Sequence, residues 1–146
     1  MTLPEDPDTP PLADAEQAPH RRLRLIGLVA AGGAAGTAAR HLLTQAFPAA
    51  AEPLAILGIN TVGAFALGLL LEQLVRSGPD TGRRLAARVT VGTGVLGGFT
   101  TYSTLALDTV QLSAGSFAGV GYAIGTLALG VAAAFAGVLL ASPRRA

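Results

Sequence analysis

Residues 89–108, VTVGTGVLGGFTTYSTLALD, combine high hydropathy with many residues that weaken a helix. The segment carries four glycines and a run of hydroxyl side chains: Gly92, Gly94, Gly97, Gly98, Thr100, Thr101, Ser103 and Thr104. Each interior glycine costs a helix about 1 kcal/mol relative to alanine. Broken helices at membrane depth persist where they are buried in protein or line a polar cavity, and transporters use them to hold ions. The segment therefore predicts an ion or small-solute site inside a membrane protein.

The rest of the chain supports an all-α integral membrane protein with four transmembrane helices. Its 146 residues are 51% hydrophobic and 13% charged, with a mean hydropathy of +0.53. The apolar stretches 25–47, 54–75, 86–107 and 117–141 each reach the roughly 20 residues that cross a bilayer core. A cleaved signal peptide is the alternative for the first stretch, but its length, the interrupting Arg40 and the three later stretches argue against it. We expect the third helix to be interrupted.

The chain divides into three regions. Residues 1–24 form a proline-rich acidic tail ending in an arginine cluster, and this composition predicts disorder. Residues 25–141 form the transmembrane domain, and residues 142–146 a short second tail. Without cysteine the chain has neither disulfides nor thiolate metal sites, and its two histidines share no helical spacing, which argues against zinc or haem.

The basic residues indicate one fixed orientation in the membrane. All ten are arginine. If the four helices alternate in direction, nine of them fall on one side: Arg21, Arg22, Arg24, Arg76, Arg83, Arg84, Arg88, Arg144 and Arg145. Only Arg40 falls on the other side. By the positive-inside rule, both termini are expected in the cytoplasm.

Glycine pairs at four-residue spacing predict close helix packing. They are Gly32/Gly36, Gly94/Gly98, Gly115/Gly119 and Gly121/Gly125. Such pairs let helix backbones approach closely, within one subunit or between subunits. Packing within one subunit explains some of them, and their number favours an oligomer, most simply a dimer.

Three polar residues in or beside the spans are candidates for function, because buried polar groups in membranes usually face the bundle interior or a wet cavity. Arg40 either snorkels to the interface or has a functional role. The amide of Asn60 can donate to an anion, and its alternative is a hydrogen bond between helices. Asp108 ends the third stretch and is also explained by the water boundary.

Three segments together resemble the Fluc or CrcB family of bacterial fluoride channels. They are GGAAGTAAR at 32–40, GINTVGAFALG at 58–68 and GGFTTYSTL at 97–105. The four-helix layout fits as well, so the resemblance covers about residues 25–141. The first motif alone is weak, but three in the same order at similar spacing are fairly specific.

This resemblance implies an antiparallel two-subunit channel with two narrow pores that passes fluoride passively out of the bacterial cytoplasm. It implies a structural sodium ion at the dimer centre, held by the backbone carbonyls of Gly97 and Thr100. The fluoride pore would contain Asn60, Tyr102, Ser103, Thr104, Leu105, Tyr122 and Thr126, whereas Arg40 would lie toward a vestibule or support the fold. Tyr122 and Thr126 are spaced to share one helix face. Fluoride is strongly hydrated, so a selective pore must replace its water with closely placed donors.

The chain departs from the family at two positions. Tyr102 and Leu105 stand where the family usually has phenylalanines. The tyrosine keeps a ring, whereas leucine has no polarised ring edge. Together with the one-sided arginines, this difference leads to the hypothesis that the chain forms a heterodimer with an oppositely oriented homologue, a homodimer being the alternative.

Other classes stay open at this point. A non-conducting scaffold or accessory subunit would explain the glycines and the missing phenylalanine. A small multidrug exporter has a similar size but needs a membrane carboxylate, and the first stretch has none. An enzyme is least expected, because no nucleophile–base pair, metal cluster or phosphate loop is present. No nucleic-acid partner is expected.

Overall fold

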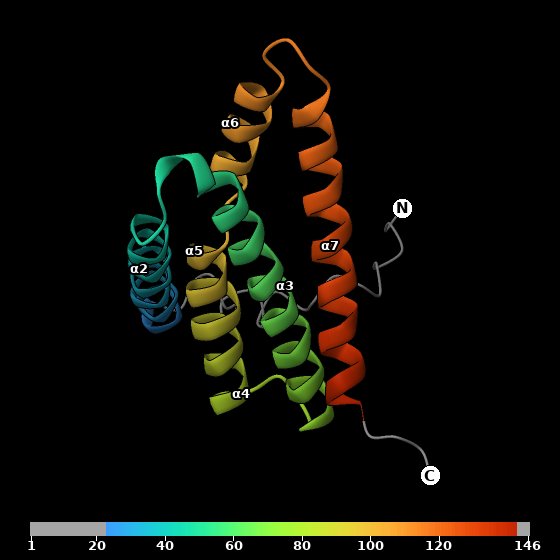
Figure 1. Ribbon diagram of the computed structural model, residues 1–146. Coiled ribbons are helices and arrows are strands. Elements are labelled where there is room, and N and C mark those ends of the chain that lie inside the picture. Colours follow the sequence, from blue (N-terminus) through green and yellow to red (C-terminus); the bar gives the residue numbers. More distant parts are fainter. Residues whose placement is uncertain (1–22, 143–146) are drawn as a thin grey trace, which may run out of the picture.

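The computed structural model describes residues 23–142, and over this range it contains helices and turns without any strand (Figure 1). The elements are α2 (Leu23–Gln45), the 3₁₀-helix η2 (Ala49–Ala51), α3 (Glu52–Arg76), α4 (Gly82–Ala87), the π-helix η3 (Arg88–Leu96), α5 (Gly97–Phe99), α6 (Tyr102–Leu112) and α7 (Ala118–Ala141). The predicted all-helical class is confirmed for this range. Disorder is predicted for the acidic tail, whose residues 1–22 lie outside the described range.

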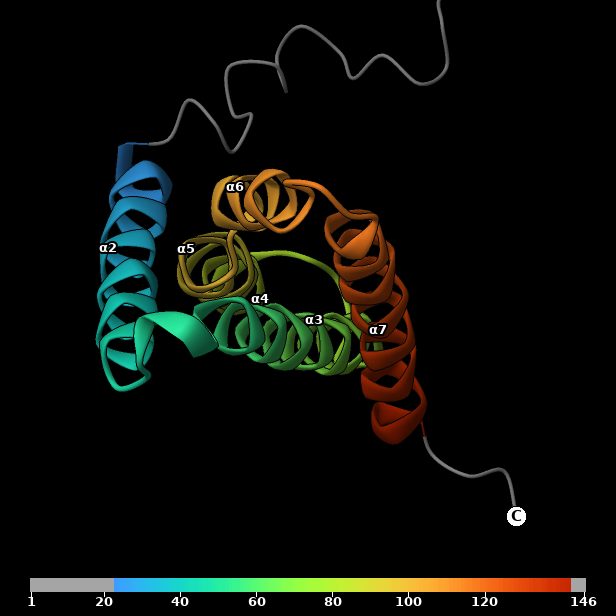
Figure 2. The ribbon, with the colours of Figure 1, turned by 45° about the horizontal axis from the view of Figure 1, so that its top comes forward.

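The two longest apolar helices, α3 and α7, pack along each other (Figure 2). Residues Ala49–Arg76 and Ala118–Ala141 are long and apolar enough to cross a membrane. Two of the four predicted spans therefore meet this test; α2 is weaker because alanine and glycine replace larger apolar residues, and the third stretch is divided into shorter helices. A Cβ at Gly68 would overlap the carbonyl of Ala134, so the two backbones nearly touch.

Helix α2 packs against η3 and α5 through glycines on both sides. Figure 1 shows α2 foreshortened and Figure 2 shows it at length, so it is steeply inclined to α3 and α7. A Cβ at Gly36 would overlap the Val95 carbonyl, and one at Gly98 would overlap the Gly33 carbonyl. Backbones in such close contact tolerate only glycine.

The predicted glycine pairs therefore have different uses. Gly32/Gly36 and Gly94/Gly98 face each other inside this chain, which is the intrachain alternative. Gly115 takes φ +82 in the turn before α7, where a residue with a side chain would be strained. A Cβ added at Gly121 or Gly125 on α7 would have nothing within 4 Å, so that face of α7 is open.

The residues Gly82–Phe99 form one right-handed helical column, which contains the first part of the third predicted stretch. The residues at the joins of α4, η3 and α5 all have helical backbone angles. Two extended residues then separate α5 from α6. The helical parts reach beyond the predicted stretch on both sides, to Gly82 and Leu112.

Many large apolar side chains lie on the outside of the described helices. Val131 on α7 is 72% exposed, and Phe135 and Leu140 are exposed on the same helix. Contiguous apolar surface of this extent is costly in water but not in hydrocarbon. The surface is therefore that expected of a protein lying in lipid.

Candidate functional site

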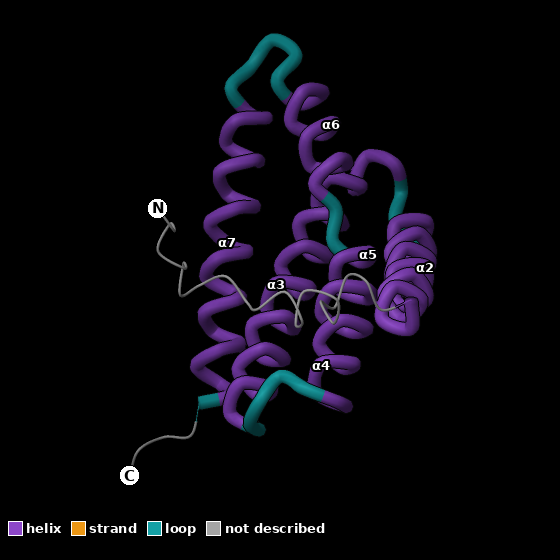
Figure 3. The backbone as a smooth tube through the Cα atoms, turned by 180° about the vertical axis from the view of Figure 1, so that it is seen from behind, coloured by secondary structure: helices purple, strands orange, loops and turns teal. Residues whose placement is uncertain are grey.

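The candidate site is built around Thr100 and Thr101, the two extended residues between α5 and α6, which Figure 3 shows as a short loop between helices. The backbone N–H and the hydroxyl of Thr100 both donate to the Leu96 carbonyl at 2.9 Å, which ends the helical column. The hydroxyl of Thr101 accepts from the backbone N–H of Thr104 at 3.3 Å. Thr101 is thus the N-cap of α6, a position that threonine favours.

Asn60 on α3 pairs with the backbone of Thr101 on both sides. The N–H of Thr101 donates to Asn60 Oδ1 at 2.8 Å, and Asn60 Nδ2 donates to the Thr101 carbonyl at 3.0 Å. A buried extended residue would otherwise leave both of its peptide groups without helical partners. The Asn60 side chain supplies these partners in the way that a neighbouring strand would.

The two extended residues 100 and 101 are called the break. Two side chains of α2 contact the backbone just before it. Arg40 Nε donates to the Gly98 carbonyl at 3.2 Å, and Thr37 Oγ1 approaches the same oxygen at 3.4 Å. Arg40 is half-buried. Its guanidinium therefore lies at the C-terminal end of the helical column, where a positive charge interacts favourably with the helix dipole.

A cluster of hydroxyls surrounds the start of α6. Thr101 Oγ1 lies 3.2 Å from Ser103 Oγ and 3.2 Å from Thr104 Oγ1. Ser103 is exposed and Thr104 is half-buried. Ser103 is thus able to turn its hydroxyl outward.

An open groove of about 620 Å³ lies over the break. Six predicted site residues line it: Asn60, Gly97, Thr100, Tyr102, Leu105 and Thr126. The ring of Tyr102 is 80% exposed, whereas Leu105 is only 6% exposed. The two positions that depart from the family pattern thus differ in surroundings: one side chain projects from the chain and the other packs within it.

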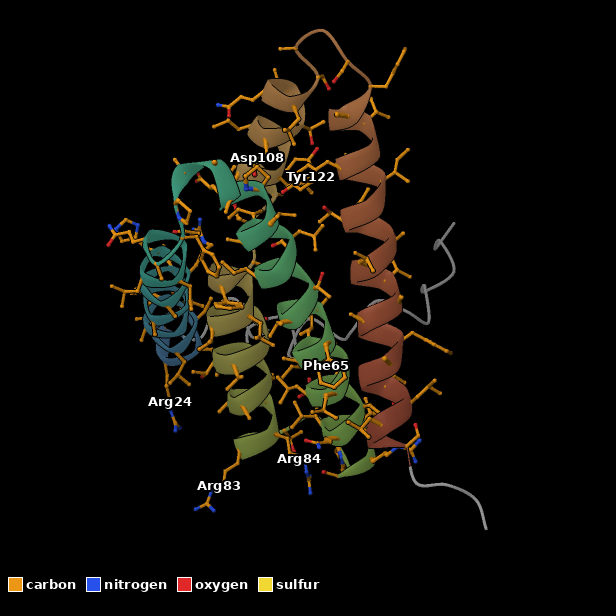
Figure 4. The ribbon with its side chains drawn as sticks, viewed as in Figure 1. Arg24, Phe65, Arg83, Arg84, Asp108 and Tyr122 are labelled. Atoms are coloured by element: carbon orange, nitrogen blue, oxygen red, sulfur yellow. The ribbon has the colours of Figure 1, made fainter. Side chains whose placement is uncertain are left out.

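A second polar group lies near the far ends of α6 and α7. Figure 4 shows Asp108 and Tyr122 beside each other there. The Tyr122 hydroxyl is 3.0 Å from the Pro53 carbonyl and 3.3 Å from Asp108 Oδ2, and Asp108 is 5% exposed. Thr126 is also buried, and its hydroxyl donates to the Tyr122 carbonyl at 2.8 Å.

Arginines gather at the opposite end of the described structure. Figure 4 shows Arg24, Arg83 and Arg84 at that end, where Arg84 donates to the Pro79 carbonyl at 3.3 Å. Arg76, at the end of α3, pairs with Glu72 at 2.5 Å and donates to Ser142 Oγ at 3.0 Å. These contacts tie the ends of α3 and α7 together on the arginine-rich side.

The predicted residues therefore fall into three places: the groove, the hydroxyl cluster and the Asp108–Tyr122 pair, with Arg40 behind the break. Sequence reasoning missed the central role of Thr101 and the contact of Thr37. The pattern Thr-x-x-Thr at 101–104 is a possible N-cap signal for Thr101, whereas nothing in the sequence marked Thr37. Between residues 23 and 142 no group of three or more His, Cys, Asp or Glu residues is placed to hold a metal ion. A cation in this region would need backbone or hydroxyl oxygens.

Comparison with known proteins gives one consistent family. Residues 27–138 match the family described as CrcB-like protein, Camphor Resistance (CrcB). The chain is 52% identical over 124 residues to the "Fluoride-specific ion channel FluC 2" of Leifsonia xyli, covering 83% of this chain and 86% of the relative. It is 45% identical over 128 residues to "FluC 1" of Cutibacterium acnes (85% and 88% covered) and 38% identical over 120 residues to "FluC" of Agrobacterium fabrum (79% and 94% covered).

Proposed function

The chain belongs to the CrcB-like family of membrane ion channels and is not an enzyme, and from this premise we propose that it is a subunit of a fluoride-selective channel. The proposed activity is passive fluoride export, which lowers the fluoride concentration of the cytoplasm. One structural observation carries the proposal: two of the three motifs that suggested the family meet at the break, where Asn60 of the second pairs with Thr101 of the third. The first motif contacts the same break through Arg40.

We infer a plasma-membrane protein with four membrane crossings. These are α2, α3, the segment 82–112 and α7, with the extended residues at membrane depth. The gathering of Arg24, Arg83 and Arg84 at one end supports a fixed orientation with cytoplasmic termini.

We infer that the working unit is a dimer with an oppositely oriented homologue. Three features of this chain support a partner: the open groove over the break, the projecting ring of Tyr102 and the open glycines of α7. An apolar groove next to polar backbone must be closed before it excludes lipid from an ion path.

The proposed central sodium ion would be held by the carbonyls of Gly97 and Thr100. These ligands suit sodium, because hard cations prefer oxygen ligands. The Gly97 carbonyl is also without its usual helical hydrogen bond, since the N–H of Thr101 donates to Asn60 instead. Gly97 also lines the open groove and is exposed. A bound cation would supply positive potential beside an anion path.

The proposed fluoride path uses donors that the chain does not exhaust in its own fold. Asn60 keeps a second N–H on Nδ2, since amide nitrogens carry two hydrogens and one donates to Thr101. Ser103 and Tyr102 are exposed, so their hydroxyls are accessible. Tyr122 and Thr126 donate within the chain and would act on fluoride only after exchanging partners. Such donors together replace the water that fluoride sheds on entering a narrow pore.

A second candidate is a non-conducting accessory subunit. It is favoured by Leu105, which offers no ring edge and is packed inside the chain. In that case no fluoride flux would occur even with every partner present.

Fluoride efflux from liposomes tests the proposal. The chain is reconstituted alone and with its nearest homologue from the same genome, with chloride-loaded vesicles as the ion control and Asn60→Ala as the site variant. Flux that needs both chains supports the heterodimer, and flux from this chain alone refutes it but keeps the channel. An absence of fluoride flux in both preparations refutes the channel and leaves the accessory subunit.

A further inference from the structure

We propose that Asn60, Arg40 and Thr37 are positioning residues for the cation site: Asn60 keeps the Gly97 carbonyl free of a helical donor, and Arg40 and Thr37 hold the next carbonyl, that of Gly98. This inference rests on the proposed function for the identity of the site, but it assigns a different task to its residues. Asn60 acts here through the backbone of Thr101, whether or not it also touches fluoride.

The first step concerns the amide of Thr101. In a continuous α-helix this N–H would donate to the carbonyl four residues earlier, that of Gly97. Here it donates instead to Asn60 Oδ1 at 2.8 Å. The neighbouring Thr100 offers no replacement, because both its N–H and its hydroxyl donate to Leu96. The Gly97 carbonyl is thus released by Asn60.

The second step concerns the residue after Gly97. The Gly98 carbonyl receives Arg40 Nε at 3.2 Å and lies 3.4 Å from Thr37 Oγ1. These contacts depend on the close approach of α2, since a Cβ at Gly98 would overlap the Gly33 carbonyl. Two side chains of α2 therefore fix the peptide between Gly98 and Phe99, one residue beyond the Gly97 carbonyl, while Asn60 of α3 fixes the start of α6.

The third step concerns the electrostatics. The Gly97 carbonyl lies at the C-terminal end of the column 82–99, where the helix dipole is negative. Arg40 contributes position and not attraction here: it holds the Gly98 carbonyl through a hydrogen bond from the α2 side. Gly97 faces the groove, and a Cβ added there would have no atom within 4 Å. A small cation arriving from the groove thus meets an oxygen that is free and held in place.

The test measures sodium binding through stability, which needs no ion flux. The full-length chain, with its homologue where the complex requires it, is purified in detergent, and its thermal midpoint is followed as sodium chloride replaces N-methylglucamine chloride. We expect Asn60→Ala to raise the sodium concentration for half-maximal stabilisation about tenfold or more, because two hydrogen bonds are lost.

The controls separate positioning from fluoride contact. Asn60→Asp keeps an acceptor for the Thr101 N–H but loses the donor to the Thr101 carbonyl, so it should raise the half-maximal sodium concentration less than Asn60→Ala does, while its fluoride flux falls. Thr61→Ala, on the next residue of α3, removes only a 2.8 Å bond within that helix and should leave the sodium response unchanged. If Asn60→Ala does not fold, Thr37→Val removes one contact to Gly98 and should raise the half-maximal sodium concentration about two- to fivefold.

Each outcome has one meaning. An unchanged sodium response in Asn60→Ala, or in Thr37→Val if Asn60→Ala does not fold, overturns the proposal. A wild-type protein without any sodium response overturns it together with the cation site. A sodium response that shifts as expected in a protein without fluoride flux supports the positioning role and removes the proposed channel activity.

Discussion

Gly36→Ala should destabilise the fold through the contact of α2 with η3. The new Cβ would overlap the Val95 carbonyl and approach the Phe99 nitrogen to 2.9 Å, where ordinary contacts are 3.4–4 Å. Backbone atoms cannot rotate away, so α2 would have to move by on the order of 1 Å, which forfeits a large part of its dispersion contacts.

The same movement would break the contacts behind the candidate site. Thr37 and Arg40 reach the Gly98 carbonyl at 3.4 and 3.2 Å, so a further ångström takes both beyond hydrogen-bond range. Overpacking costs about 1–3 kcal/mol and each lost hydrogen bond about 1 kcal/mol. We therefore expect a loss of about 3–5 kcal/mol in the free energy of unfolding relative to a matched glycine-to-alanine control.

Gly27→Ala is that control, because Gly27 lies on the same helix and a Cβ added there would have nothing within 4 Å. It reports the gain in helix propensity, at most about 1 kcal/mol, without a clash. Both variants are unfolded with sodium dodecyl sulfate in mixed micelles and followed by circular dichroism. Unfolding free energies that agree within about 0.5 kcal/mol would refute the close-packing argument.

Three further predictions follow from the described contacts. Tyr122→Phe removes the donor to a buried carboxylate and should lower the free energy of unfolding by about 1–3 kcal/mol in the same assay. Tyr102→Phe, at an exposed ring, should change the free energy of unfolding by less than about 0.5 kcal/mol. Equal costs would contradict the assigned hydrogen bonds. Leu105→Phe overpacks a buried position and should cost about 1–3 kcal/mol in the isolated chain, and a gain in stability would show that the position has room. Because the chain has no cysteine, Ser77→Cys and Ser116→Cys give single labelling sites: in intact cells an impermeant maleimide should label only the second, and labelling of both would contradict the single orientation.

Composition and spacing were sufficient to predict an all-helical membrane protein and to select the segment that carries the candidate site. Glycines and hydroxyl residues in an apolar run are a local signal, readable without knowledge of the fold. The pairing of Asn60 with Thr101 joins residues 41 positions apart and depends on how α3 meets the break. The sequence offered an interhelical hydrogen bond as the alternative use of Asn60, and the structure contains such a bond.

Other features required the three-dimensional arrangement. Two adjacent threonines have different tasks: Thr100 ends one helix and Thr101 begins the next. Tyr102 and Leu105 lie three residues apart, yet only the second faces the interior, because that depends on where α6 meets its neighbours. Glycine spacing predicts close contact but does not identify the partner, and only the structure assigns Gly32 and Gly36 to contacts within the chain.

The π-helix η3 bears on how insertions and deletions act along this chain. A π-turn holds more residues than an α-turn, so the nine residues Arg88–Leu96 contain spare chain length within an otherwise α-helical column. Loss of one residue there lets the backbone tighten into α-turns without a large displacement of its two ends. Loss of one residue before Asn60 in α3 instead rotates the rest of that helix by about 100°. Loss of one residue is thus absorbed in η3, whereas in α3 it separates Asn60 from Thr101.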